Sequence, residues 1–233
     1  MLISAPHPQV QLVGSFAELV GTRFSGQVNA LCWQRQLPGD FGEVVAQLNA
    51  GEEIDALDET VLRGLALSAA GRQAVAVLLE DLSGLRNLGL APVLNCIRRY
   101  PRDEPNAIVP LDVYSFHADS ATVETDTYLC SYSESASEGL GNADALRCVD
   151  DPVTRVRLRE EFGGEEGPEF DAYLHENCYD LHYAAKPGAR PYPFGLGNFW
   201  RIAVDYPGSP VPPCVHRAPE NMPGRPPRLL LIS

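Results

Sequence analysis

Basic side chains are scarce in this sequence, and long apolar runs are missing. The 233 residues include 18 Lys and Arg against 31 Asp and Glu, which gives a formal net charge of −13. Such an excess of negative charge repels nucleic acid backbones and anionic membrane surfaces, so we expect neither as a main partner. No apolar run is long enough to span a bilayer. A small acidic co-substrate stays compatible with this charge, because one local Arg can outweigh the overall field.

Signals for secretion and for cysteine pairing are missing as well. The segment Met1–Pro6 has neither the basic start nor the long apolar stretch of a signal peptide, which favours a cytoplasmic location. The cysteines are scattered and include no Cys-x-x-Cys pair, so we expect reduced core residues rather than a disulfide framework. The six cysteines are Cys32, Cys96, Cys130, Cys148, Cys178 and Cys214.

The composition fits one globular unit with a substantial core. Hydrophobic residues make up 45% of the chain, an ordinary fraction for a folded domain. A chain of this length forms one large domain or two small ones. No internal repeat, low-complexity tract or interdomain linker stands out in the sequence, so we predict a single domain over residues 1–233.

Helical patterns dominate residues 1–91. Pro38 and Gly39 break the chain after a predicted strand, and Asp40 is a suitable N-cap for the helix that follows. Apolar residues at helical spacing mark the buried face of a later helix, and they are Val75, Leu78, Leu79, Leu82 and Leu85. The predictions are an irregular or partly strand-like segment at 1–27, a strand at 28–35, and helices at 40–49, 55–68 and 72–88.

From residue 92 the pattern changes to short β-rich runs separated by Gly and Pro. Strands are predicted at 92–100, 111–117, 122–132, 181–185, 198–205, 213–217 and 228–232. Two short helices are predicted at 150–162 and 169–178, inside an acidic insert at about 141–190. Helices followed by many short strands indicate an α+β fold, with N-terminal helices packed on a jelly-roll barrel, the double-stranded β-helix. The barrel would occupy residues 92–233.

A His-x-Asp sequence at His117 and Asp119 is the first candidate for chemistry. Residues i and i+2 of a strand project from the same face, so both side chains can reach one ion. With the distant His216, they would supply two imidazoles and one carboxylate to one face of a metal. That set, with open positions opposite, is typical of non-haem Fe(II) oxygenases. The plainer interpretation is a pair of solvated loop residues, or a His bonded to a nearby carboxylate.

Four features in chain order make residues 92–233 resemble the double-stranded β-helix of the Fe(II)- and 2-oxoglutarate-dependent dioxygenases. They are the strand Asn95-Cys96-Ile97-Arg98-Arg99-Tyr100, the pair His117 and Asp119, a strand leading to a turn at Glu138-Gly139-Leu140, and His216 with the downstream Arg228. The resemblance implies that His117, Asp119 and His216 bind Fe(II). It also implies that a basic residue on the last strand holds the far carboxylate of 2-oxoglutarate.

Arg228 is the first choice for that basic residue, because the apolar run Leu229–Ile232 behind it suits a barrel strand. Its guanidinium can bind a carboxylate through two parallel hydrogen bonds and stays charged in a poorly solvated site. Arg225 is the alternative anchor, and a surface Arg at a strand end is the plainer interpretation of either. Asn95 and Tyr100 are candidates for further hydrogen bonds to the co-substrate. Strand alternation puts these two on opposite faces, so both point inward only if the strand contains a bulge.

A competing metal site would consist of His175, Cys178 and His182. On one continuous helix these side chains would share a face, which is a possible zinc arrangement. No fourth ligand follows at a familiar spacing, and the residues around His182 already have the pattern of a strand. The alternatives are a partly buried Cys flanked by surface His residues, or His side chains that line a substrate entrance.

The N-terminal third carries a second resemblance. The segment Cys32–Leu37, followed much later by Phe-His-x-Asp, is similar to a bacterial domain family of unknown function. This similarity brings no substrate with it. It does indicate that the helical first third and the barrel belong to one unit.

The dioxygenase resemblance implies hydroxylation of a small molecule by O₂, coupled to oxidative decarboxylation of 2-oxoglutarate. Asp119 favours hydroxylation, because halogenating relatives lack that carboxylate. The insert at 141–190 would form a lid, with Gly163-Gly164 and Pro187-Gly188 as hinges. Two alternatives stay open: a non-catalytic, cupin-like metal-binding protein that senses or stores a metal, and a structural barrel. Arg228 distinguishes the dioxygenase from the metal-binding protein, because a protein that only senses or stores a metal does not need this residue.

Overall fold

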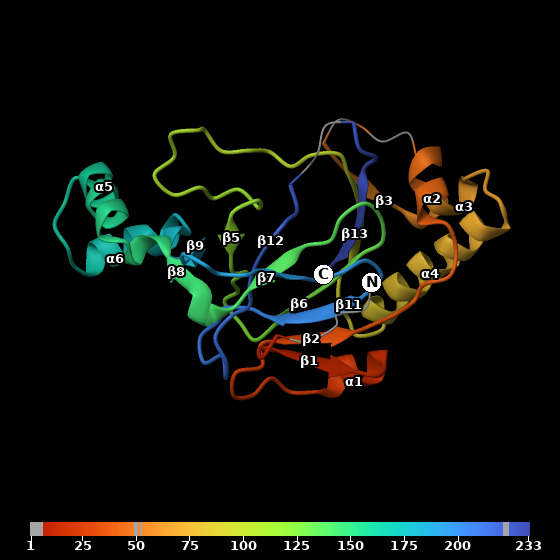
Figure 1. The fold of residues 1–233 in the computed structure, drawn as a ribbon, viewed down its shortest axis with the longest axis horizontal. Coiled ribbons are helices and arrows are strands. Elements are labelled where there is room, and N and C mark those ends of the chain that lie inside the picture. Colours follow the sequence, from red (N-terminus) through yellow and green to blue (C-terminus); the bar gives the residue numbers. More distant parts are fainter. Residues whose placement is uncertain (1–6, 49–50, 52, 221–223) are drawn as a thin grey trace.

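The computed structural model describes residues 7–48, 51, 53–220 and 224–233. These residues form an α+β structure with two curled sheets and helices at its periphery (Figure 1). No helix in the described ranges is both long and apolar enough to cross a membrane.

The larger sheet has seven strands. In the order in which they pair they are β1 (Val10–Val13), β2 (Ala30–Trp33), β11 (Phe199–Ala203), β6 (Asp126–Ser131), β13 (Arg228–Ile232), β4 (Val93–Ile97) and β3 (Ile54–Leu57). β1 and β2 pair in parallel, and the other pairs named are antiparallel. Alternation along β13 shows the two faces: Leu229 and Leu231 pack toward the helices, while Leu230 packs toward the second sheet.

The smaller sheet has six strands, and all of its pairs are antiparallel. In pairing order they are β10 (Tyr192–Pro193), β7 (Glu138–Leu140), β12 (Val215–Arg217), β5 (Phe116–His117), β9 (His182–Ala185) and β8 (Ala145–Arg147). Phe116, Leu140 and Val215 form an apolar cluster on one face of this sheet. The opposite face contributes to a core with the larger sheet, centred on Trp200 and Phe194.

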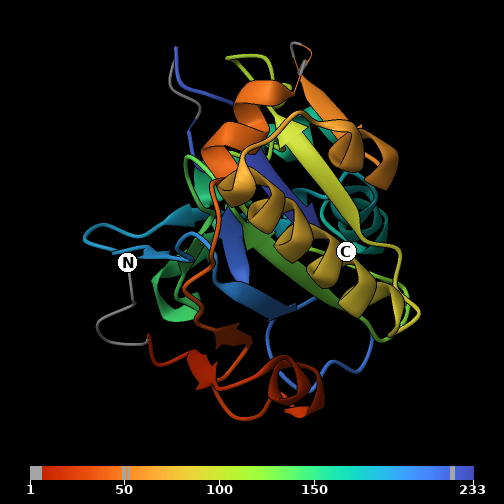
Figure 2. The ribbon, with the colours of Figure 1, turned by 90° about the vertical axis from the view of Figure 1, so that its right-hand side faces the viewer.

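Four helices belong to the N-terminal part, and their caps explain where they begin. They are α1 (Phe16–Gly21), α2 (Phe41–Gln47), α3 (Glu59–Gly64) and α4 (Ala69–Arg86). The side chains of Ser15, Asp40, Asp58 and Ser68 each accept a hydrogen bond from a backbone N–H of the first turn that follows. α4 lies across the outer face of the larger sheet (Figure 2) and buries the apolar stripe that includes Leu78, Leu82 and Leu85.

A buried polar network joins α4 to the larger sheet. The guanidinium of Arg35 donates two hydrogen bonds to the Asp81 carboxylate, at 2.7 and 2.8 Å. The hydroxyl of Tyr132 donates to the same carboxylate at 2.7 Å. The rings of Trp33 and Phe199 lie within 5 Å of the guanidinium carbon of Arg35. Every charge in this network is therefore paired, and the helix is held in one position on the sheet.

The segment between β7 and β9 projects from the body as an arm (Figure 1). It contains α5 (Pro152–Phe162) and α6 (Pro168–Glu176), together with strand β8 and three short 3-10 helices, Asn142–Asp144, Cys148–Asp150 and Tyr179–Leu181. α5 and α6 pack on an apolar cluster that includes Leu158, Phe170 and Leu174, together with Val109 from the segment before β5. The arm thus has a core separate from that between the sheets, and it shares this core with the segment before β5.

Most of the predicted elements are confirmed, with shorter bounds. The strand at 28–35, the helices at 40–49 and 72–88, and both helices of the insert correspond to β2, α2, α4, α5 and α6. The predicted end of the first helix, Asn49, lies outside the described residues. The strands predicted at 92–100, 122–132, 181–185, 198–205, 213–217 and 228–232 correspond to β4, β6, β9, β11, β12 and β13. The lead-in at 1–27, expected to be irregular or partly strand-like, contains strand β1 and, in addition, the unpredicted helix α1.

Three predictions of local structure are wrong. The helix at 55–68 is split, because Ile54–Leu57 pairs with β4 as an edge strand and Asp58 then caps the short α3. The strand at 111–117 shrinks to two residues, because the Asp112 carboxylate accepts from the next backbone N–H groups and forms a turn. Residues 138–140 form strand β7 rather than a turn, because both β10 and β12 pair with them.

Replacing Asp81 by Ala should lower the free energy of unfolding by about 3 kcal/mol, because the Arg35 charge would be left buried without its partner. Urea unfolding followed by circular dichroism measures the change. Glu80→Ala is the matched control, since Glu80 is the exposed neighbour on the same helix, and its effect should stay within about 0.5 kcal/mol. Equal effects of the two substitutions would contradict a stabilising role for the network.

Candidate metal centre

Five strands of the smaller sheet contribute one residue each to a single row. Along the sheet the row reads Tyr192, Gly139, His216, His117 and His182, each directly opposite the next. Directly opposed residues of an antiparallel pair project from the same face. The three imidazoles of this row therefore stand side by side on one face. Gly139 is required here, because a Cβ at this position would overlap the ring of Tyr192.

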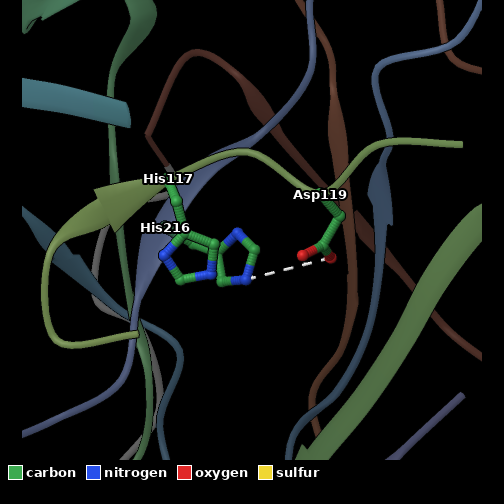
Figure 3. Close-up of side chains that lie close together, drawn as sticks. All are labelled: His117, Asp119 and His216. Carbon is green, nitrogen blue, oxygen red and sulfur yellow. Dashed lines mark ion pairs between the residues drawn. The ribbon is translucent and has the colours of Figure 1, made fainter. Parts of the chain in front are cut away.

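Asp119 completes the cluster from the segment that follows β5. One ligand atom from each of His117, Asp119 and His216 lies within 4.8 Å of the other two. Nε2 of His216 is 4.0 Å from Oδ2 of Asp119, and the two imidazole centroids are 4.6 Å apart. Figure 3 shows the three side chains converging on one point. The spacing leaves room for one ion between them.

The tautomers of both imidazoles follow from their hydrogen bonds. Nδ1 of His117 is 2.8 Å from the carbonyl oxygen of Ser115, and Nδ1 of His216 is 3.2 Å from that of Cys214. A carbonyl oxygen can only accept, so each Nδ1 carries the proton. Each Nε2 is then left with a lone pair, which is the form that binds a metal.

Burial and neighbouring groups shift the protonation of the cluster in opposite directions. Burial, together with the nearby His216, lowers the pKa of His117 to about 4. Burial alone would raise the pKa of Asp119, but the electrostatic interaction with the nearby His216 and a 2.5 Å hydrogen bond from the Thr127 hydroxyl lower it below its usual value. At neutral pH the pair is therefore a neutral imidazole and a carboxylate, both ready to coordinate.

A cavity of about 190 Å³ extends from the cluster to Arg228. Its polar lining consists of the three cluster residues with Asn95, Tyr100, Ser137 and Arg228. Its apolar lining consists of Ile54, Ile97, Val113, Leu129, Ala218, Leu230 and Ile232. The cavity thus has a potential metal site at one point, a cation at another, and apolar walls between them.

Arg228 is a buried cation with hydroxyl partners and no acid. It is 4% exposed, and its Nη2 donates to the hydroxyls of Ser131 and Ser137, both at 2.8 Å. Nη1 donates to the Tyr100 hydroxyl at 3.3 Å. Nε has no hydrogen-bond partner, and no carboxylate of the described ranges pairs with this guanidinium. Burial lowers the pKa of Arg228, while the neighbouring Tyr100 acts in the opposite direction.

Of the other residues expected around the co-substrate, two line the cavity and one lies outside it. Asn95 and Tyr100 both line the cavity, although strand alternation would separate them. β4 ends before Tyr100, and the backbone N–H groups of Arg98 and Arg99 both donate to the carbonyl of Glu53, which is the irregularity of a bulge. Arg225, in contrast, lies outside this cavity. It is 66% exposed and forms an ion pair with Glu134 at 3.3 Å.

The competing site at His175, Cys178 and His182 does not form. α6 ends at Glu176, and Cys178 follows with a positive φ of 59°, so the three residues do not share a helix. His175 is 69% exposed and contacts Asp180, whereas His182 is buried in β9. Among the described residues, the cluster of His117, Asp119 and His216 is the group of three that could hold a metal. The zinc alternative is therefore wrong.

Four polar residues around the site were missed in the sequence: Thr127, Ser131, Ser137 and His182. Thr127 and Ser131 are four apart in a predicted strand and so share a face, which was a usable signal. Ser137 and His182 carry no such signal, because strand pairing alone brings them to the site.

Comparisons of the chain with protein-family models, with curated proteins and with solved structures gave no match.

His117 should keep its neutral form to unusually low pH in the metal-free protein. Its ring resonances in an NMR titration should move with a midpoint near pH 4. Between about pH 6.5 and pH 4, His117 is protonated in the unfolded chain but not in the folded protein. The free energy of unfolding should therefore fall as the pH is lowered through this window. His117→Gln should flatten that dependence. A midpoint near 6.5 would show that the ring is solvated.

Proposed function

We propose that this protein is a non-haem Fe(II)- and 2-oxoglutarate-dependent oxygenase that hydroxylates a small molecule. One observation carries the proposal: the His117, Asp119 and His216 cluster lines the same cavity as a buried guanidinium for which no described residue supplies an acidic partner. A metal site alone would not need that cation. A structural barrel would need neither feature, because both cost stability in a protein interior.

The proposal includes a jelly-roll barrel, and strand pairing supports it. Taking β4, β5, β6, β7, β9, β11, β12 and β13 as first to eighth, the first pairs with the eighth, the second with the seventh and the third with the sixth. Nested pairing of this kind is what a rolled-up hairpin produces. The fourth and fifth strands, β7 and β9, lie apart in the smaller sheet, and the arm is inserted between them.

The donor set of the cluster fits Fe(II). Two imidazole nitrogens and one carboxylate oxygen from one side of a metal leave the remaining positions free, which is the ligand set of the non-haem Fe(II) oxygenases. The bonds from Nδ1 to Ser115 and Cys214 orient both rings, and the Thr127 hydroxyl orients Asp119. These partners hold the ligands before a metal binds.

The distal end of the cavity fits the far carboxylate of 2-oxoglutarate. Nε of Arg228 is a free donor, and the hydroxyls of Ser131, Ser137 and Tyr100 surround the same guanidinium. A bound carboxylate would neutralise the buried charge and could also accept from these hydroxyls. When bound, iron and 2-oxoglutarate would supply the oxidising chemistry with O₂, leaving succinate and CO₂. Asp119 occupies its ligand position, which favours hydroxylation of the substrate.

The arm between β7 and β9 is proposed as the substrate lid. Gly163 ends α5 with a φ of 72°, and Gly188 has a φ of 83° in the loop after β9. Residues in this left-handed region are suited to absorb a change in backbone direction. α5 and α6 share an apolar core that also includes Val109 of the segment before β5.

Anaerobic titration with Fe(II) tests the metal and the co-substrate together. Wild-type protein should develop the visible charge-transfer band of the iron chelate when 2-oxoglutarate is added. His117→Ala should lose the band, because one of three ligands is removed. Iron binding without any response to 2-oxoglutarate would instead favour a cupin-like metal sensor or store.

Arg228→Ala should weaken 2-oxoglutarate binding by at least about 30-fold, since it removes the partner of a buried carboxylate. The apparent affinity is read from the same absorption band at increasing 2-oxoglutarate. Arg225→Ala serves as the control and should bind like wild type, because its side chain is exposed and outside the cavity. The reverse result would assign the anchor to Arg225.

A further inference from the structure

His182 is a buried histidine beside the proposed ligands that has no role in the site described so far. It lies in β9 directly opposite His117 and is 7% exposed. It does not belong to the group whose ligand atoms lie within 4.8 Å of one another. Any part it plays in metal binding is therefore exerted through another residue.

The ring of His117 has an imidazole on each side. β5 lies between β12 and β9, so His216 and His182 flank His117 from neighbouring strands. The centroid distances are 4.6 Å to His216 and 5.9 Å to His182, with interplanar angles of 52° and 32°. His216 has Phe194 as a further stacked neighbour, at 6.4 Å. The row of ligand rings is thus bounded at one end by Phe194 and at the other by His182.

His182 is itself fixed by the arm. Its Nδ1 is 2.9 Å from the carbonyl oxygen of Cys178, so Nδ1 carries the proton and donates it. Cys178 stands at the turn between α6 and β9, in the left-handed backbone region. The orientation of the His182 ring is therefore tied to the point where the arm returns to the sheet.

We propose that His182 is a positioning residue that holds the plane of the His117 imidazole by packing against it. A metal must lie in the plane of the ring, along the lone pair of Nε2. The hydrogen bond from Nδ1 to Ser115 anchors one edge of the ring but leaves it free to tilt about that bond. The His182 ring, with its centroid 5.9 Å away and its plane tilted by 32°, limits this freedom. The inference deepens the proposed function, because it assumes that His117 is a metal ligand.

Cobalt(II) is the probe for this proposal, because it accepts the same nitrogen and oxygen ligands and absorbs visible light. Titrations of wild type, His182→Ala, His182→Phe and His175→Ala give affinity and ligand-field spectrum for each. His182→Ala should weaken binding about 10-fold and shift the spectrum, as loss of a supporting neighbour does. His182→Phe should recover most of both, since it restores a flat ring. His175→Ala, an exposed histidine of the same arm, should change neither.

Two results would overturn the proposal: wild-type affinity and spectrum in His182→Ala, or no recovery in His182→Phe. Thermal unfolding without metal shows whether each variant is folded. If His182→Ala does not fold, His182→Leu replaces it, because leucine keeps the bulk of the side chain but has no flat ring. Its cobalt(II) affinity and spectrum then show whether the flat ring is needed. Failure of wild type to bind cobalt(II) would refute the metal site itself. Binding by wild type together with an unaffected His182→Ala would refute only the role of His182.

Discussion

Register in the smaller sheet is the constraint on which the site depends. The backbone pairing that sets His117 opposite His216 and His182 also puts Phe116 and Val215 on the other face, in an apolar cluster. A slip of one residue in β5 would exchange the two faces. It would then expose Phe116 to the polar cavity and bury His117 among apolar side chains. Packing of the outer cluster and assembly of the metal ligands are thus one structural requirement.

Two buried arginines differ in how their positive charge is compensated. Arg35 has a carboxylate, a carbonyl and two aromatic rings as partners, so its charge is fully compensated within the chain. Arg228 has three hydroxyls, an unpaired Nε and an adjoining cavity. Burying a cation without a compensating anion lowers the stability of the folded state, unless a bound ligand supplies the negative charge. Under the proposed function, such a local cation would let a chain with a net charge of −13 accept an acidic small molecule.

Under the proposed function, each part of the fold contributes to the same site. The larger sheet supplies Arg228, Ser131 and Thr127, while the smaller sheet supplies the imidazoles. α4 braces the larger sheet from outside through the network at Asp81. The arm approaches the imidazole row at His182, and this contact joins the proposed lid to a proposed ligand. In the proposed function, a movement of the arm would therefore reach the candidate metal ligands through His182.

The sequence by itself determined features that act over a few residues: the cap at Asp40 and the apolar stripe of α4. His117 and Asp119 do lie close together, but β5 ends at His117, so they do not share the face of one strand. The sequence also pointed to His216 and Arg228, through a resemblance in the order of motifs. Tertiary structure alone decided what depends on partners. Residues 54–57 became a strand because the edge of β4 was available to them, against the helical reading of 55–68. Ser137 and His182 reached the site through pairing between strands distant in sequence, and such hydrogen bonds leave no local pattern.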